Sequence, residues 1–227
     1  MRVDLDFAPG LHGHFLELVL NKYIYGVAFE GPTIFQSSGA VHPINLDRKY
    51  QSNKIVNRGH FSSFGHKFDR DAVHIIFIKH NPELDFVLLT NIFYRCHPRA
   101  INASDFNIDD IMNLHKDALI DGSDLELRNY WFVKLQERQF EHTSKTPQTG
   151  LPVYNFDYKS FFSFGNFCQE LKNASRFLNQ TFRFDSSLAT LWNEFISRNQ
   201  GWNLYNTGNN LVNSILQQKE ISIPNDW

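Results

Sequence analysis

The sequence predicts an α/β fold of three layers, with a mainly parallel central sheet and a helical distal half. Residues 2–7 alternate between charged and apolar side chains and are followed by turn residues and then by a helical pattern. Residues 72–79 are β-branched, aromatic and apolar through their centre, as in a strand that is buried on both faces. Beyond residue 160, helical patterns dominate. Strands that alternate with helices favour an open parallel sheet, with its ligand site at the carboxyl ends of the strands.

The first half of the chain contains three predicted strands and two predicted helices. Residues 2–7 form the first strand, and apolar residues at helical spacing predict a helix from 14 to 25. Gly, Ser and Pro are frequent from 26 to 53, which indicates a long surface excursion. The remaining elements of this half are strands at 54–57 and 72–79 and a helix at 86–94.

The second half is predicted to be mostly helical. Gly122 separates two helices within residues 105–140, because Ser123 and Glu126 after it have the spacing of a capping box. Residues 142–152 are rich in Ser, Thr, Pro and Gly and form a linker. No internal repeat interrupts the pattern, so residues 1–227 are expected to form a single domain. The further elements are a strand at 153–156, a helix capped by Ser160 and reaching Leu178, a helix at 186–198 ended by Gly201, and a helix at 208–218.

Composition excludes several classes of protein. The 227 residues include 42% hydrophobic and 20% charged residues, which is ordinary for a globular protein, and no apolar run approaches the roughly 20 residues that cross a bilayer. With a net charge of -2, the chain has no excess of positive charge with which to bind nucleic-acid phosphates independently of sequence. Two cysteines, Cys96 and Cys168, are too few for a disulfide framework, and acidic residues near the N-terminus replace the apolar core of a secretion signal. A cytoplasmic protein that binds neither nucleic acid nor membrane is expected.

The loop that joins the first strand to the first helix is a candidate anion site. Gly10 and Gly13 lie where a loop must turn into a helix, and the first N–H groups of a helix attract phosphate or sulfate. The loop lacks the Gly-Lys-Ser/Thr ending of the nucleoside triphosphate P-loop. The motif is therefore consistent either with an anion cradle or with a tight turn that binds nothing.

Three segments in order carry a resemblance to a known family. They are Ala8-Pro-Gly-Leu-His-Gly-His-Phe-Leu16, Arg58-Gly-His-Phe61, and Ile75-Ile-Phe-Ile-Lys-His-Asn-Pro82 with the helix that follows it. Together they resemble the sulfotransferase family, which has a P-loop-like α/β fold and uses the donor 3′-phosphoadenosine 5′-phosphosulfate. Residues 151–202, which end in Asn199-Gln-Gly-Trp202, are more loosely similar to the distal half of distant sulfotransferase-like proteins.

The resemblance implies a role for each matching residue. His60 would be the catalytic base and Arg58 would hold the sulfuryl group, which passes to a hydroxyl of a carbohydrate or small-molecule acceptor. A histidine suits this task because its ordinary pKa lies near neutrality. The donor-binding residues implied by the first and third segments are Gly10, Leu11, His12, Gly13, His14 and Phe15 for the 5′ end, and Lys79, His80 and Thr90 for the 3′-phosphate.

Several positions depart from the family pattern. Leu11 stands where the family has Lys or Arg, and His80 stands where it has Arg. His12 and His14 replace the Ser and Thr that flank the glycine, and Leu88 replaces a serine that Thr90 lies near. Neutral histidine cannot replace a charged, bidentate guanidinium. The alternative is therefore a catalytically inactive relative that binds a nucleotide or anion, or that acts as a structural or interaction module.

Other clusters allow two interpretations each. Five histidines within the first 66 residues suggest a metal, but their spacing is not diagnostic of a metal site, so no metal is assigned. Glu17 could bond a loop histidine or be an ordinary acid near a helix start. The aromatic residues from Tyr154 to Phe164 suggest a stacking platform or, more simply, a packed core. The histidines concerned are His12, His14, His42, His60 and His66.

Overall fold

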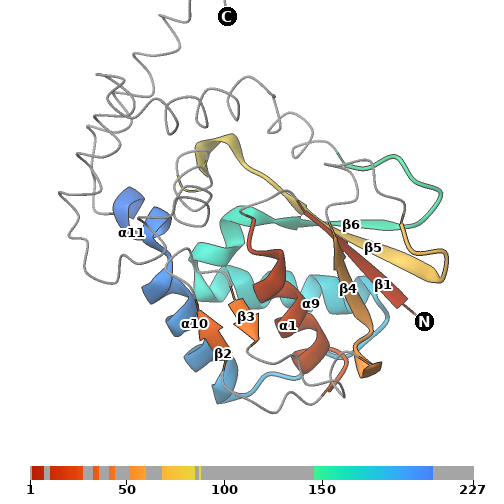
Figure 1. Cartoon of the computed structure of the whole chain (residues 1–227), viewed down its shortest axis with the longest axis horizontal. Helices are drawn as coiled ribbons and strands as arrows, with labels where there is room; N and C mark the ends of the chain where they lie inside the picture. Colours follow the sequence, from red (N-terminus) through yellow and green to blue (C-terminus); the bar gives the residue numbers. More distant parts are fainter. Residues whose placement is uncertain are drawn as a thin grey trace, which may run out of the picture.

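The described part of the chain contains a four-stranded parallel sheet (Figure 1). The computed structural model describes residues 2–7, 11–27, 33–35, 41–43, 52–59, 68–84, 87 and 146–206. The strand order is β4–β1–β5–β6, and all three neighbouring pairs are parallel. This confirms the expected α/β class and parallel sheet. The strands are β1 (Arg2–Asp6), β4 (Val56–Gly59), β5 (Ala72–Lys79) and β6 (Val153–Asp157).

β1 lies inside the sheet, and its two faces carry different chemistry. Val3, Leu5 and the following Phe7 are buried in the hydrophobic core. Asp4 and Asp6 point to the opposite face and are also fully buried. The Asp4 carboxylate accepts a hydrogen bond from the backbone N–H of Asp69 (2.7 Å), yet burial raises the pKa of Asp4 above its ordinary value.

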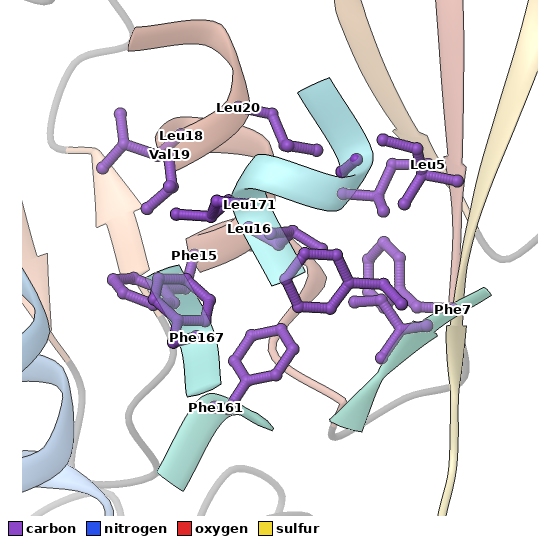
Figure 2. Packing of buried hydrophobic residues seen from close by; sticks show 14 of the residues in the cluster. Leu5, Phe7, Phe15, Leu16, Leu18, Val19, Leu20, Phe161, Phe167 and Leu171 are labelled. Atoms are coloured by element: carbon purple, nitrogen blue, oxygen red, sulfur yellow. The ribbon is translucent and has the colours of Figure 1, made fainter. Parts of the chain in front are cut away.

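Helix α1 (Gly13–Tyr23) is buried on most of its surface. Its side chains meet those of α9 (Phe164–Phe177) on the core face of the sheet, as Figure 2 shows for Phe15, Phe167 and Leu171. The rings of Phe15 and Phe167 stack with their centroids 5.6 Å apart. Both helices therefore share one core with the strands.

The aromatic segment after β6 is part of this core. Phe156, Tyr158 and Phe161 are fully buried, which fits the packed-core interpretation of the cluster. Tyr158–Phe162 form the 3₁₀ helix η3, and Ser163 precedes α9. The predicted cap at Ser160 is wrong, because its hydroxyl donates to the carbonyl of Asp157 (2.6 Å) within the 3₁₀ turn.

Two helices follow α9, namely α10 (Ser186–Arg198) and α11 (Gln200–Asn206). Helix α10 has the bounds predicted from the sequence, 186–198. Gly201 does not end it as predicted but lies inside α11, and Asn199 forms the junction between the two helices. α10 packs against α1 through the rings of Phe195 and Phe15, which stack with their centroids 4.2 Å apart.

The predicted surface excursion contains a short antiparallel pair, β2 (Thr33–Phe35) and β3 (Val41–Pro43). A 3₁₀ turn, η1 (Pro82–Leu84), follows β5. Among the residues that the structure describes, no helix is long and apolar enough to span a membrane. The helices predicted at 105–140 and 208–218, most of the helix at 86–94 and the first part of the linker at 142–152 lie outside the described residues.

Asp185 caps α10, and its removal is expected to destabilise the protein in a pH-dependent way. The carboxylate accepts hydrogen bonds from the hydroxyl of Ser187 and from its backbone N–H (2.8 Å), which together lower the pKa of Asp185 below its ordinary value. A lowered pKa means that the stabilisation is present above the ordinary value and is lost as pH falls through the folded-state pKa. Asp185→Ala should cost about 1 kcal/mol at neutral pH.

Urea unfolding at neutral pH and near pH 3 measures this loss. Asp185→Asn is the control, because it keeps an oxygen acceptor but cannot titrate. A cost of Asp185→Ala that is equal at both pH values would contradict the assignment of the cap to the carboxylate.

Candidate functional site

The strand order identifies the edge of the sheet at which a ligand is expected. The chain passes from β1 to β4 on one side of β1 and then returns to β5 on the other side. The direction in which successive strands are added to the sheet therefore reverses between β1 and β5. In open parallel sheets, ligands bind outside the carboxyl ends of the strands at this point. The loop that leads into α1 follows the carboxyl end of β1, and His80 follows that of β5.

Two predicted site residues, from the segments that follow β1 and β5, pack against the same aromatic ring at this edge. The ring centroid of His12 is 5.9 Å from that of Tyr158, in a stacked arrangement. The ring centroid of His80 lies 6.0 Å from the same tyrosine. All three side chains are buried. The structure thus brings the loop before α1, the end of β5 and the start of η3 together.

The backbone of His12 forms the start of α1. Its φ of 56° is left-handed, and its carbonyl accepts hydrogen bonds from the N–H groups of Phe15 (2.9 Å) and Leu16 (3.2 Å). The helix begins with no side-chain cap and with no acidic residue in its first turn. The positive end of the α1 dipole is therefore not offset by a carboxylate of that turn.

The described side chains between Leu11 and Phe15 point mainly into the protein. Leu11 and Phe15 are fully buried in the core, so neither side chain can contact a ligand at the sheet edge. The N–H of Phe15 is used within the helix turn. Gly13 packs directly under the ring of Phe7, and the ring of His14 lies edge-on to the same phenylalanine at 6.3 Å. A ligand at this loop would be bound mainly by backbone groups.

Arg58 binds a carboxylate of α1. Its guanidinium forms an ion pair with Glu17, and Lys54 approaches the other oxygen of the same carboxylate at 3.1 Å. The Glu17 side chain is 4% exposed, against 23% for Arg58 and 16% for Lys54. Glu17 therefore holds two cations, and the interpretation that it bonds a loop histidine finds no support among these contacts.

Lys79 is an exposed cation at the carboxyl end of β5, where it pairs in register with Asp157 of β6. Nearby on the surface, Lys159 forms an ion pair with Glu83 (2.6 Å), and this carboxylate raises the pKa of the Lys159 ammonium. The charge of Lys159 is thus already offset by a neighbour. Lys79 is the better candidate for contact with an anionic ligand.

The sequence patterns included Tyr158 only in an aromatic run that suggests a stacking platform or a packed core, and they gave Asn199 no role in this site. Tyr158 comes directly after β6, and the rule that places ligand sites at the carboxyl ends of parallel strands could have singled it out. Asn199 lies 187 residues from His12 in sequence, and no local pattern indicates that pairing.

Other predicted site residues, namely Gly10, His60 and Thr90, lie outside the described residues. Within the described part of the chain, no group of three His, Cys, Asp or Glu side chains could hold a metal ion. His12 and His14 turn toward different partners, Tyr158 and Phe7 respectively.

Comparisons with models of protein families, with curated proteins and with solved structures found no match to this chain.

Proposed function

We propose that the chain is a sulfotransferase-like protein that binds 3′-phosphoadenosine 5′-phosphosulfate at the carboxyl edge of its sheet. Its sulfuryl group would pass to a hydroxyl of a carbohydrate or small-molecule acceptor. One observation carries the proposal. The strand order reverses between β1 and β5, and the segments that resemble the two donor-binding segments of the sulfotransferase family follow these two strands.

The electrostatics of this edge suit an anionic donor. The N-terminus of α1 has no acidic residue in its first turn, so its dipole favours a sulfate or phosphate group. Lys79 is exposed at the end of the neighbouring strand and would attract the 3′-phosphate. Backbone N–H groups and one lysine give a weaker site than several arginines would, so we expect modest affinity.

The proposed reaction is an in-line transfer. His60 would take the proton of the acceptor hydroxyl as its oxygen forms a bond to sulfur, while the bond from sulfur to the 5′-phosphate oxygen breaks. Adenosine 3′,5′-bisphosphate would leave with the electron pair. Arg58 would stabilise the developing charge, which requires its guanidinium to exchange Glu17 for the donor.

A second function is favoured by two features of the structure. Leu11 is a core residue where the family has a cation, and Arg58 is held by Glu17. Both features reduce the fixed positive charge available to a transferring group. They support a protein that binds a nucleotide or anion without catalysis, and the two functions differ in whether bound donor is turned over.

Calorimetric titration with adenosine 3′,5′-bisphosphate tests the donor site. We expect saturable one-to-one binding, weakened about tenfold in Lys79→Gln because a charge-assisted hydrogen bond is lost. Lys172→Gln is the matched control, since Lys172 is an exposed lysine of α9. His60→Asn should bind the bisphosphate normally and lose sulfuryl transfer.

Each outcome has a distinct meaning. The absence of binding at millimolar bisphosphate would overturn the donor site and both functions that use it. Equal losses of bisphosphate affinity in Lys79→Gln and Lys172→Gln would show that Lys79 does not contact the ligand. Binding without transfer to any carbohydrate hydroxyl would favour the non-catalytic function.

A further inference from the structure

We propose that Asn199 is a positioning residue that holds His12 as the neutral tautomer with its proton on Nδ1, and so fixes the loop at the start of α1. The tautomer of His12 follows from the positions of its partners alone. Its effect on ligand affinity rests on the proposed function, and different measurements test the tautomer and the affinity.

The orientation of the Asn199 amide follows from its two partners. Asn199 is fully buried at the junction of α10 and α11. Its Oδ1 accepts a hydrogen bond from the backbone N–H of Trp202 (2.9 Å). A backbone N–H can only donate, so the oxygen must lie on that side. The Nδ2 amino group is then the atom that lies 2.9 Å from Nε2 of His12.

The protonation of His12 follows from the same chemistry. An amide NH₂ group donates and does not accept, so the Nε2 atom that faces it must carry a lone pair. The ring proton is then on Nδ1. The doubly protonated imidazolium is disfavoured here, because its Nε2–H would meet the N–H of the amide in a buried site. Asn199 therefore selects one of three protonation states of His12.

The held ring in turn fixes the backbone of His12. The ring is buried against Phe195, with centroids 4.9 Å apart, and against Tyr158 and Phe161. A left-handed backbone is unfavourable for a residue other than glycine, so other contacts must maintain it. The hydrogen bond to Asn199 orients this ring at Nε2, while the His12 carbonyl accepts the first helical N–H groups.

The consequence is that the C-terminal helices position the candidate binding loop. The contact joins residues 187 positions apart, one before α1 and one after α10. A neutral His12 also brings no positive charge to the loop. If the loop binds the donor, its helix N–H groups supply the attraction, and Asn199 affects affinity only by holding these groups in place.

Nitrogen-15 NMR of the histidine rings in the full chain tests the tautomer. In the wild type, Nε2 of His12 should give the signal of an unprotonated ring nitrogen and Nδ1 that of a protonated one. Asn199→Asp replaces the amino group with a carboxylate oxygen while the second oxygen still accepts from Trp202. The proton should then appear on Nε2, as the other tautomer or as the imidazolium.

A matched control separates this effect from a loss of helix stability. Asn203→Asp removes an amide that donates to the carbonyl of Ser197 (3.2 Å) in the same region. It should leave the His12 signals unchanged. A proton on Nε2 of His12 in the wild type would overturn the proposal without any variant. So would an Asn199→Asp protein whose His12 signals match the wild type.

Two further variants cover the case in which Asn199→Asp fails to fold. His12→Gln can place an amide oxygen near the position of Nε2 and should keep most of the stability, whereas His12→Leu should lose it. Equal stability of the two would count against the hydrogen bond. Titration with adenosine 3′,5′-bisphosphate tests the effect on ligand affinity. Binding should be about fivefold weaker in Asn199→Ala than in the wild type. A wild type that shows the expected tautomer but binds no bisphosphate would refute the proposed function alone.

Discussion

Alanine in place of Gly13 is expected to lower the free energy of unfolding by about 3 kcal/mol. A Cβ atom at this position would lie 2.2 Å from Cε1 of Phe7, far inside contact distance. The phenylalanine is 2% exposed within the core, so its ring has little room to move. Removing this clash would require α1 to move relative to β1. Urea unfolding followed by circular dichroism measures the loss.

The same substitution at Gly165 is the control, because that residue also lies in the first turn of a helix. An added Cβ there meets no atom within 4 Å, so Gly165→Ala should stabilise the protein by about 0.5–1 kcal/mol. Phe7→Leu replaces the opposing ring with a smaller side chain. The double variant Gly13→Ala with Phe7→Leu should therefore recover part of the lost free energy of unfolding. Gly13→Ala with wild-type stability would contradict the close packing of α1 on β1.

Removal of the Glu17 charge is expected to cost about 2 kcal/mol. Breaking a fully buried ion pair costs roughly 3–5 kcal/mol, and this value is reduced here because both cations remain partly in contact with water. Glu17→Gln preserves size while it leaves Lys54 and Arg58 without their shared carboxylate. The urea midpoint should fall, and it should fall less at high salt, where the two cations repel each other less.

The exposed ion pair between Glu83 and Lys159 provides the comparison. Both side chains are more than half exposed, at 62% and 57%. Glu83→Gln should leave the unfolding midpoint unchanged, because water and salt already screen such pairs. Glu17→Gln with an equally small effect would mean that Arg58 and Lys54 are solvated rather than held, and that Arg58 is available to a ligand.

Elements whose signal is local could be predicted from the sequence. The strand at 72–79 and the helix at 186–198 match β5 and α10 in full, because each has its own apolar pattern and nearby turn or capping residues. The strand at 153–156 extends by one residue in β6. In these segments local propensity and burial in the fold favour the same structure.

Features that depend on distant side chains could not be predicted. β4 begins at Val56 rather than Lys54. At this point the amide oxygen of Asn21 in α1 accepts the backbone N–H groups of Ile55 (2.8 Å) and Val56 (3.0 Å), a contact between residues distant in sequence. The site shows the same limit. That Arg58 would bind Glu17 follows only once the strand order places β4 beside β1. That His12 would bind Asn199 follows only once α10 packs against α1.

The alternation along β1 also makes one alignment of the sheet far more favourable than its neighbours. A slip of a single residue would turn Asp4 and Asp6 into the hydrophobic core and move Leu5 and Phe7 to the opposite face. Two carboxylates in apolar surroundings would cost several kcal/mol or force proton uptake. Because β1 pairs with both β4 and β5, this penalty aligns three strands at once. The acidic residues of β1 therefore act against misfolded pairings, and they do so before any ligand is present.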